Sequence, residues 1–88
     1  MLASQYIEHL LETAAEADNP AARRMMAGCV AAIDRGALTT YNRAADELTS
    51  RELASVLREL ADHVEQQVAG TLGAEWAERF RRDARDLE

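Results

Sequence analysis

Two histidines and a single cysteine are the side chains of this 88-residue sequence best suited to metal binding or nucleophilic chemistry. Glu59 and His63 are one helical turn apart and Asp62 precedes His63, so an imidazole and a carboxylate could share one ion. A structural zinc site needs more Cys or His ligands than this chain supplies, and di-iron bundles repeat Glu-x-x-His motifs on several helices. We therefore predict no metal site and no cofactor.

The segment around Cys29 reads MMAGCVAAI. A thiol among apolar helix residues usually behaves as a small buried hydrophobe. A catalytic cysteine needs a neighbouring base and an electropositive, partly open surrounding, and nothing close in sequence supplies either. The chain also lacks a glycine-rich phosphate loop, a nucleophile elbow and a paired catalytic carboxylate motif. We predict that the protein is not an enzyme.

The elements that must position these side chains are helices. Eighteen of the 88 residues are Ala, whereas Gly occurs four times and Pro once, a composition that favours helix and does not suit a β-sandwich or a disordered tail. Asn19-Pro20 is typical of a helix start, and Gly36 of a helix end. We expect a single domain, residues 1–88, folded as an all-α bundle of about four helices, one of them short. The expected helical segments are 2–18, 20–35, 41–48, 50–69 and 74–86, with Gly70–Gly73 interrupting the pattern and Leu87-Glu88 a candidate vector-derived scar.

Residues 48–57 read LTSRELASVL. Thr49 and Glu52 have the spacing of a capping box, in which each side chain bonds the other residue's backbone N–H. The stretch resembles the opening helix of the DNA-binding domains of bacterial response regulators, a resemblance that implies a DNA reader. That family continues with a turn and a basic recognition helix, but residues 44–70 contain six acidic and two basic side chains, which phosphates would repel. We interpret the stretch as a capped amphipathic helix, and keep a DNA-binding transcriptional regulator that uses the helix pair 41–69 as the alternative.

Charge is unevenly distributed along the chain, whose formal net charge is −6. Residues 1–20 carry four acidic side chains and no basic one, whereas residues 21–43 carry four Arg and one Asp. Three of the acids follow one another at four-residue intervals and share one helical face, which we name the acidic stripe: Glu8, Glu12 and Glu16. We expect this stripe to steer a basic partner or to meet cations across an antiparallel helix pair. The arginines that could meet it are Arg23, Arg24 and Arg35.

The core that this sequence can build is thin. A chain this short buries only about 60% of its unfolded surface, and alanine contributes little area. A shared surface would compensate, and homo-oligomerisation is the simplest source of one. Glycine inside a helix costs about 0.5–1 kcal/mol, which suggests a packing reason for it, and tryptophan and arginine dominate interface hot spots. The candidate partner or dimer interface is therefore Met25, Met26, Gly28, Trp76 and Phe80.

We also expect favourable four-residue ion pairs on the last helix, Glu75 with Arg79 and Glu78 with Arg82. Taken together, the sequence predicts a small acidic, non-enzymatic adaptor or regulatory protein that acts through protein–protein contact as a homodimer. The alternatives are the DNA-binding regulator and a metal-binding helical bundle. A single cysteine, no visible signal peptide and no long apolar run indicate a cytoplasmic location, with nucleic acid and membrane not expected as partners.

Overall fold

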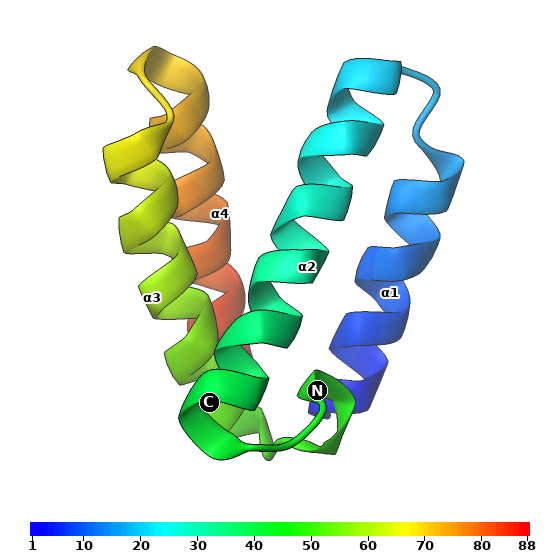
Figure 1. Ribbon diagram of the computed structural model, residues 1–88, viewed down its shortest axis with the longest axis vertical. Coiled ribbons are helices and arrows are strands. Elements are labelled where there is room, and N and C mark those ends of the chain that lie inside the picture. The colour runs from blue at the N-terminus through cyan, green and yellow to red at the C-terminus, as the bar shows by residue number, and fades with distance from the viewer.

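The computed structural model describes all 88 residues. It contains four α-helices and no strands. These are α1 (Ala3–Glu16), α2 (Pro20–Tyr41), α3 (Ser50–Gln67) and α4 (Gly70–Leu87), and a single 3-10 turn, η1 (Ala45–Glu47), lies between α2 and α3. In Figure 1, α1 and α2 form one antiparallel pair, α3 and α4 form another, and the two pairs diverge toward the top of the view. The predicted all-α fold class is confirmed. No helix combines the length and the apolar character that a membrane span requires.

Helix α2 is longer than the sequence predicts. Asn19 caps its start, with the side-chain oxygen accepting from Ala21 N at 2.9 Å, as expected. Its predicted end at Gly36 is wrong, because the helix continues to Tyr41. A Cβ at Gly36 would lie 3.0 Å from Val56 Cγ1. This glycine lets α2 approach α3 and does not terminate the helix. The helix ends at Tyr41, after which Asn42 adopts the left-handed φ of 53° and its N–H bonds Leu38 O.

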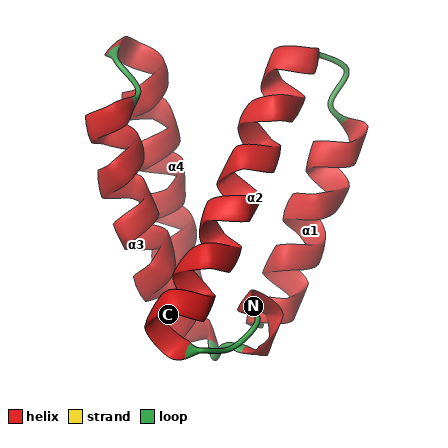
Figure 2. Cartoon of the chain, viewed as in Figure 1, coloured by secondary structure: helices red, strands yellow, loops and turns green.

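The predicted short helix at 41–48 is reduced to η1. Figure 2 shows this turn set between loop segments that join α2 to α3. Ala45 and Leu48 are both buried and anchor the connection to the core, so it is fixed by packing more than by its own hydrogen bonds. The helix pair 41–69 that a DNA-reading motif would require is therefore absent, because Tyr41 belongs to α2 and only α3 remains helical in that stretch.

Helices α3 and α4 make most of the helix–helix contacts. The predicted interruption at Gly70–Gly73 is wrong, since α4 already begins at Gly70 and only Val68 and Ala69 separate the two helices. Gly70 has a φ of +80°, and a Cβ at Gly73 would lie 2.0 Å from the Val68 carbonyl oxygen. The short turn therefore requires a glycine at the start of α4. Each of the two helices carries two fully buried alanines: Ala54 and Ala61 on α3, and Ala77 and Ala84 on α4.

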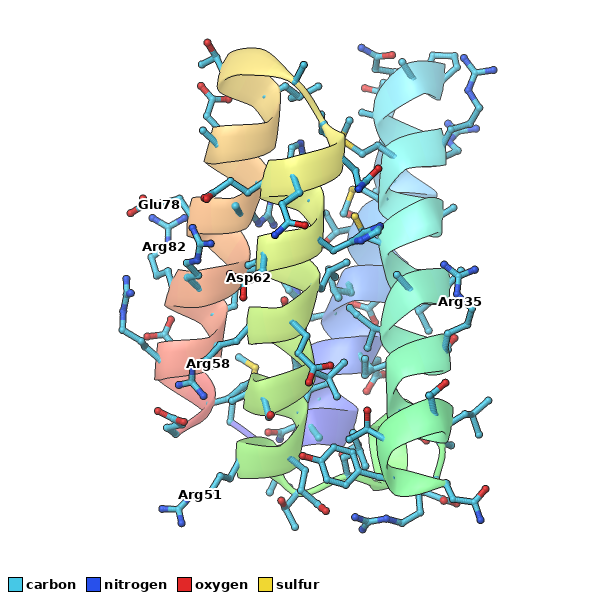
Figure 3. All side chains as sticks on the ribbon, turned by 60° about the vertical axis from the view of Figure 1, so that its left-hand side comes forward. Arg35, Arg51, Arg58, Asp62, Glu78 and Arg82 are labelled. Carbon is cyan, nitrogen blue, oxygen red and sulfur yellow. The ribbon has the colours of Figure 1, made fainter.

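The outer surface of this hairpin is charged. In Figure 3, Arg58 and Asp62 project from α3 and Glu78 and Arg82 from α4 on the side away from α2. Arg81 bridges the two helices, with Nη1 2.6 Å from Glu65 Oε2 and Nη2 2.9 Å from Asp62 Oδ1. These hydrogen bonds raise the pKa of Arg81.

The last two residues also contact the hairpin. Leu87 is buried in the core, and Glu88 Oε1 lies 2.6 Å from Arg58 Nη2. Because both partners of this ion pair are largely exposed, it adds little to stability. Burial of Leu87 in the core contributes more, because it removes an apolar side chain from water.

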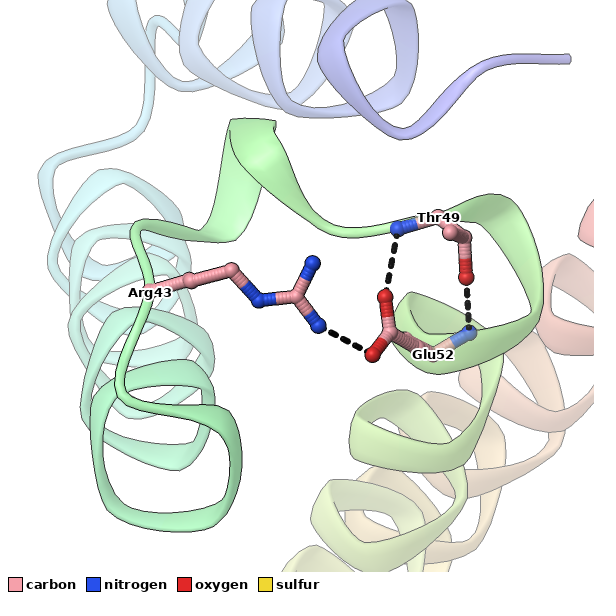
Figure 4. Close-up of polar contacts among 3 residues, drawn as sticks. All are labelled: Arg43, Thr49 and Glu52. Carbon is pink, nitrogen blue, oxygen red and sulfur yellow. Dashed lines mark hydrogen bonds and ion pairs between the residues drawn. The ribbon is translucent and has the colours of Figure 1, made fainter.

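The start of α3 carries the predicted capping box. Thr49 Oγ1 accepts from Glu52 N at 3.1 Å, and Glu52 Oε1 accepts from Thr49 N at 3.0 Å. The second carboxylate oxygen of Glu52 pairs with Arg43, so one side chain ties the cap to the end of α2, as Figure 4 shows. The backbone hydrogen bond from Thr49, followed by the contact with Arg43, lowers the pKa of Glu52.

The two glycine environments predict opposite effects of the same substitution. Gly73→Ala is expected to lower the free energy of unfolding by about 1–3 kcal/mol, because the added methyl group overlaps the Val68 carbonyl. Gly28→Ala is the matched control, since a Cβ there meets nothing within 4 Å, and it is expected to raise the free energy by about 0.5–1 kcal/mol. Urea unfolding of dilute protein, followed by circular dichroism, measures both. Equal effects of the two substitutions would contradict the assigned role of Gly73.

Candidate functional site

The most apolar concave surface of the molecule lies where the two helix pairs diverge. Met25, Gly28 and Cys29 of α2 face Leu60 and Val64 of α3 across it. Trp76 of α4 also lines it, and Arg35 and His63 are the charged or titratable side chains among its lining residues other than Cys29. The free space is about 210 Å³. We name this surface the α2–α3 groove.

The five predicted interface residues separate into two groups. Met25, Gly28 and Trp76 line the α2–α3 groove together, although Trp76 is far from the other two in sequence. Met26 and Phe80 are core residues, exposed by only 5% and 0%. Within this subunit they belong to the core and do not line the groove. Met26 directly follows the groove residue Met25, and one residue turns a helical side chain by about 100°.

Gly28 does not mark a tight helix crossing within the chain. It is exposed, and the space beside it is open, so the packing reason inferred from its cost is not found inside this subunit. Its effect is to leave the α2 edge of the groove flat and unobstructed.

Trp76 is held by neighbours but is only half-buried. Its ring centroid lies 5.8 Å from that of Phe80 in a tilted arrangement, which anchors one side of the indole to the core. The Arg79 guanidinium lies 5.3 Å from the indole centroid. The predicted pairs of Glu75 with Arg79 and of Glu78 with Arg82 are not formed, and for Arg79 the indole face takes the place of the carboxylate.

Cys29 is half-buried in the groove and its pKa is raised by burial. A raised pKa disfavours the thiolate, which is the nucleophilic form. His63 lines the same groove, yet no hydrogen bond joins the two side chains. This arrangement is that of a small apolar side chain and not that of an activated nucleophile.

The acid–histidine neighbours on α3 are not assembled around a common point. No three His, Cys, Asp or Glu side chains lie close enough together to hold a metal ion. Asp62 is engaged by Arg81 on the outer surface of the hairpin, whereas His63 faces the groove. The two residues thus point to different sides of α3.

The acidic stripe is exposed along its whole length. None of Glu8, Glu12 and Glu16 makes an ion pair, and the expected approach of arginines from α2 does not occur. Arg23 instead donates to the Ala17 carbonyl oxygen, with Nη2 at 2.6 Å and Nε at 3.1 Å. The stripe therefore has no cationic partner within this subunit.

A second concave surface, which the sequence did not predict, lies between α1 and α4. It has a free volume of about 160 Å³ and is lined by both polar and apolar side chains. Tyr6 donates its hydroxyl hydrogen bond to Asp83 Oδ2 at 2.8 Å, and burial, followed by the nearby Asp83 charge, raises the pKa of Tyr6 strongly. This contact ties the first helix to the last. It joins residues 77 positions apart, so no local pattern could have revealed it.

Removal of the Tyr6 hydroxyl is expected to weaken the bundle and to change its response to alkaline pH. Tyr6→Phe should lower the free energy of unfolding at pH 7 by about 1–2 kcal/mol. Because the folded-state pKa of Tyr6 lies above its ordinary value of 10.0, the wild type keeps this stability below pH 10 and loses it as the pH rises further. The variant should lose less over the same range.

Urea unfolding between pH 8 and about pH 11 measures this difference. Tyr41→Phe is the control, because it leaves the contact between Tyr6 and Asp83 in place, and Cys29 is unchanged in every protein compared. An equally steep loss above pH 10 in Tyr6→Phe and in the wild type would exclude the assigned contribution of Tyr6.

The assignment of a site depends on these surfaces alone. Comparison with known protein families, with curated proteins and with solved structures finds no match to this chain. No relative therefore suggests a ligand, a reaction or a partner. The α2–α3 groove has more apolar lining residues than the surface between α1 and α4 and collects three of the predicted interface residues, and it is our candidate functional site.

Proposed function

We propose that this protein is a small, non-enzymatic adaptor or regulatory protein that acts through protein–protein contact. In this proposal it works as a homodimer in which a second copy of the chain covers the α2–α3 groove. The single cysteine forms no intrachain disulfide, which fits a reducing cytoplasm as its location.

The observation that carries the proposal is the composition and burial of the groove. Its lining is mainly apolar, and Met25, Cys29 and Trp76 are neither fully buried nor fully exposed there. Half-buried large side chains on a concave surface lose further contact with water when a second surface covers them. A partly exposed tryptophan set on a core aromatic is also the kind of residue that dominates binding energy at interfaces.

The chemistry of the groove supports binding more than catalysis. The core contains no buried polar or charged side chain, and burial raises the pKa of the thiol in the groove, which disfavours its nucleophilic thiolate form. Catalysis requires groups whose pKa values and positions suit proton transfer or attack. The groove is instead lined mainly by apolar side chains, with Arg35 and His63 also among its lining residues.

A second copy is the occupant that the charge distribution favours. The chain carries acidic side chains without partners on α1 and exposed arginines without ion pairs on α2, namely Arg24 and Arg35. Two copies can therefore satisfy each other's charges, which gives orientation and faster association. Small chains with thin cores commonly gain stability in this way.

Sedimentation equilibrium tests the dimer. We expect the wild type to be dimeric at about 100 µM, and Gly28→Gln, which places a long side chain over the groove edge, to weaken the dimer about tenfold or more. Ala74→Gln is the control, because Ala74 is exposed on α4, does not line the groove and is not part of α2. A wild type that remains monomeric at that concentration would overturn the proposal.

Alkylation of Cys29 provides an independent measurement on the same surface. The only thiol of the chain lies in the groove, so its rate of reaction with a maleimide should fall as protein concentration rises and dimer forms. The expected concentration dependence should be lost in Gly28→Gln and kept in Ala74→Gln. A rate independent of concentration in a dimeric wild type would show that the dimer leaves the groove open.

A further inference from the structure

Five large apolar side chains are exposed on this protein, and they differ in their charged surroundings. They are Met1, Leu2, Leu11, Leu38 and Leu72. Leu11 is 50% exposed and lies on α1 beside the acidic stripe, with Glu8 one turn before it and Glu12 directly after it. Neither carboxylate has an ion-pair partner. Leu11 is thus an apolar side chain projecting from an acidic surface.

The α2 edge of the α2–α3 groove is the complementary surface. Arg24, Gly28 and Arg35 are four and seven residues apart, so they share one stripe along the outside of α2. Gly28 and Arg35 line the groove, and Figure 3 shows Arg35 projecting from α2 away from the bundle. The groove is therefore an apolar depression beside two unpaired cations, whereas Leu11 is an apolar projection beside two unpaired anions.

We infer that the surface of the second copy that covers the groove is the exposed face of α1. This inference rests on the proposed homodimer and names the parts that meet. Leu11 of one copy enters the groove of the other between α2 and α3, and Glu8 and Glu12 lie against Arg24 and Arg35. A two-fold symmetric dimer makes this contact twice, because each copy gives one α1 face and one groove.

The other exposed leucines on the helices fit this contact less well. Leu38 is on α2 itself, one turn after Arg35. If Leu38 of one copy entered the groove of the other, Arg35 would come with it and would meet the basic edge of that groove. Leu72 is one turn before Trp76 at the start of α4, and so belongs to the surroundings of the groove that must be covered. Charge selects Leu11 among the three.

Leucine-to-glutamate substitutions test the apolar part of the contact. Leu11→Glu should weaken the dimer about tenfold or more, because it removes the inserted side chain and places a charge in the groove. Leu2→Glu is the control, since it makes the same change at an exposed leucine at the N-cap of α1, nine residues from Leu11, and should alter the dissociation constant by less than about threefold. Circular dichroism confirms that both variants keep the helical content of the wild type.

Charge reversal tests the polar part. Glu12→Arg and Arg35→Glu should each weaken the dimer about three- to tenfold at low salt, and the double variant should recover to within about threefold of the wild type. The losses in the single variants should diminish as salt rises, because screening weakens exposed charge pairs. No recovery in the double variant would overturn the pairing of the α1 face with the α2 edge.

The outcomes separate this inference from the proposed function. A wild-type dimer that Gly28→Gln weakens and Leu11→Glu does not would overturn the role of α1 while leaving the groove as the dimer surface. A dimer that neither variant weakens would overturn both the groove and the α1 face, and a wild type that stays monomeric would do the same.

Discussion

The close approach of α3 and α4 is the constraint on which the rest of the structure depends. Both helices carry fully buried alanines, and Gly73 lets the first turn of α4 pass the Val68 carbonyl oxygen with no side chain between them. Helices whose facing residues are small can pack with short interaxial distances. The hairpin therefore needs few bulky residues for its own cohesion, and Phe80 and Leu57 remain available to form the common core with α1 and α2.

The α1–α2 pair meets this hairpin along only part of its length, and the groove follows from that. Near the ends of α2 and the start of α3, Gly36 permits a close contact with Val56, whereas toward the start of α2 the helices separate. Too few large side chains remain to fill the space between Met25 and Trp76. The groove is thus a consequence of an alanine-rich composition: the residues that favour helix do not supply the volume that closes a four-helix core.

Local signals in the sequence predicted those features whose cause is local. Asn19 and the capping box of Thr49 with Glu52 begin helices as expected, because each cap is complete within a few residues. Gly36 and Gly73 were misinterpreted as breaks, since their role depends on atoms of other helices. Periodicity identified the apolar faces that contain Met25 and Met26 but not which of them stays uncovered, because a rotation of about 100° separates adjacent helix residues and burial is decided by the neighbouring helix.

The positions of the ion pairs bear on how the protein meets a partner. All four involve Arg43, Arg58 or Arg81, and they lie at the α2–α3 connection or on the outer surface of the hairpin. Exposed pairs stabilise a fold by only about 0–1 kcal/mol, so the lack of pairs on α1 and on the outside of α2 costs the subunit little. Charges that the subunit leaves unpaired can attract opposite charges on another molecule over about the Debye length of 8–10 Å. In a symmetric assembly each such contact occurs twice, so interactions too weak to matter in folding can still determine the orientation of two copies.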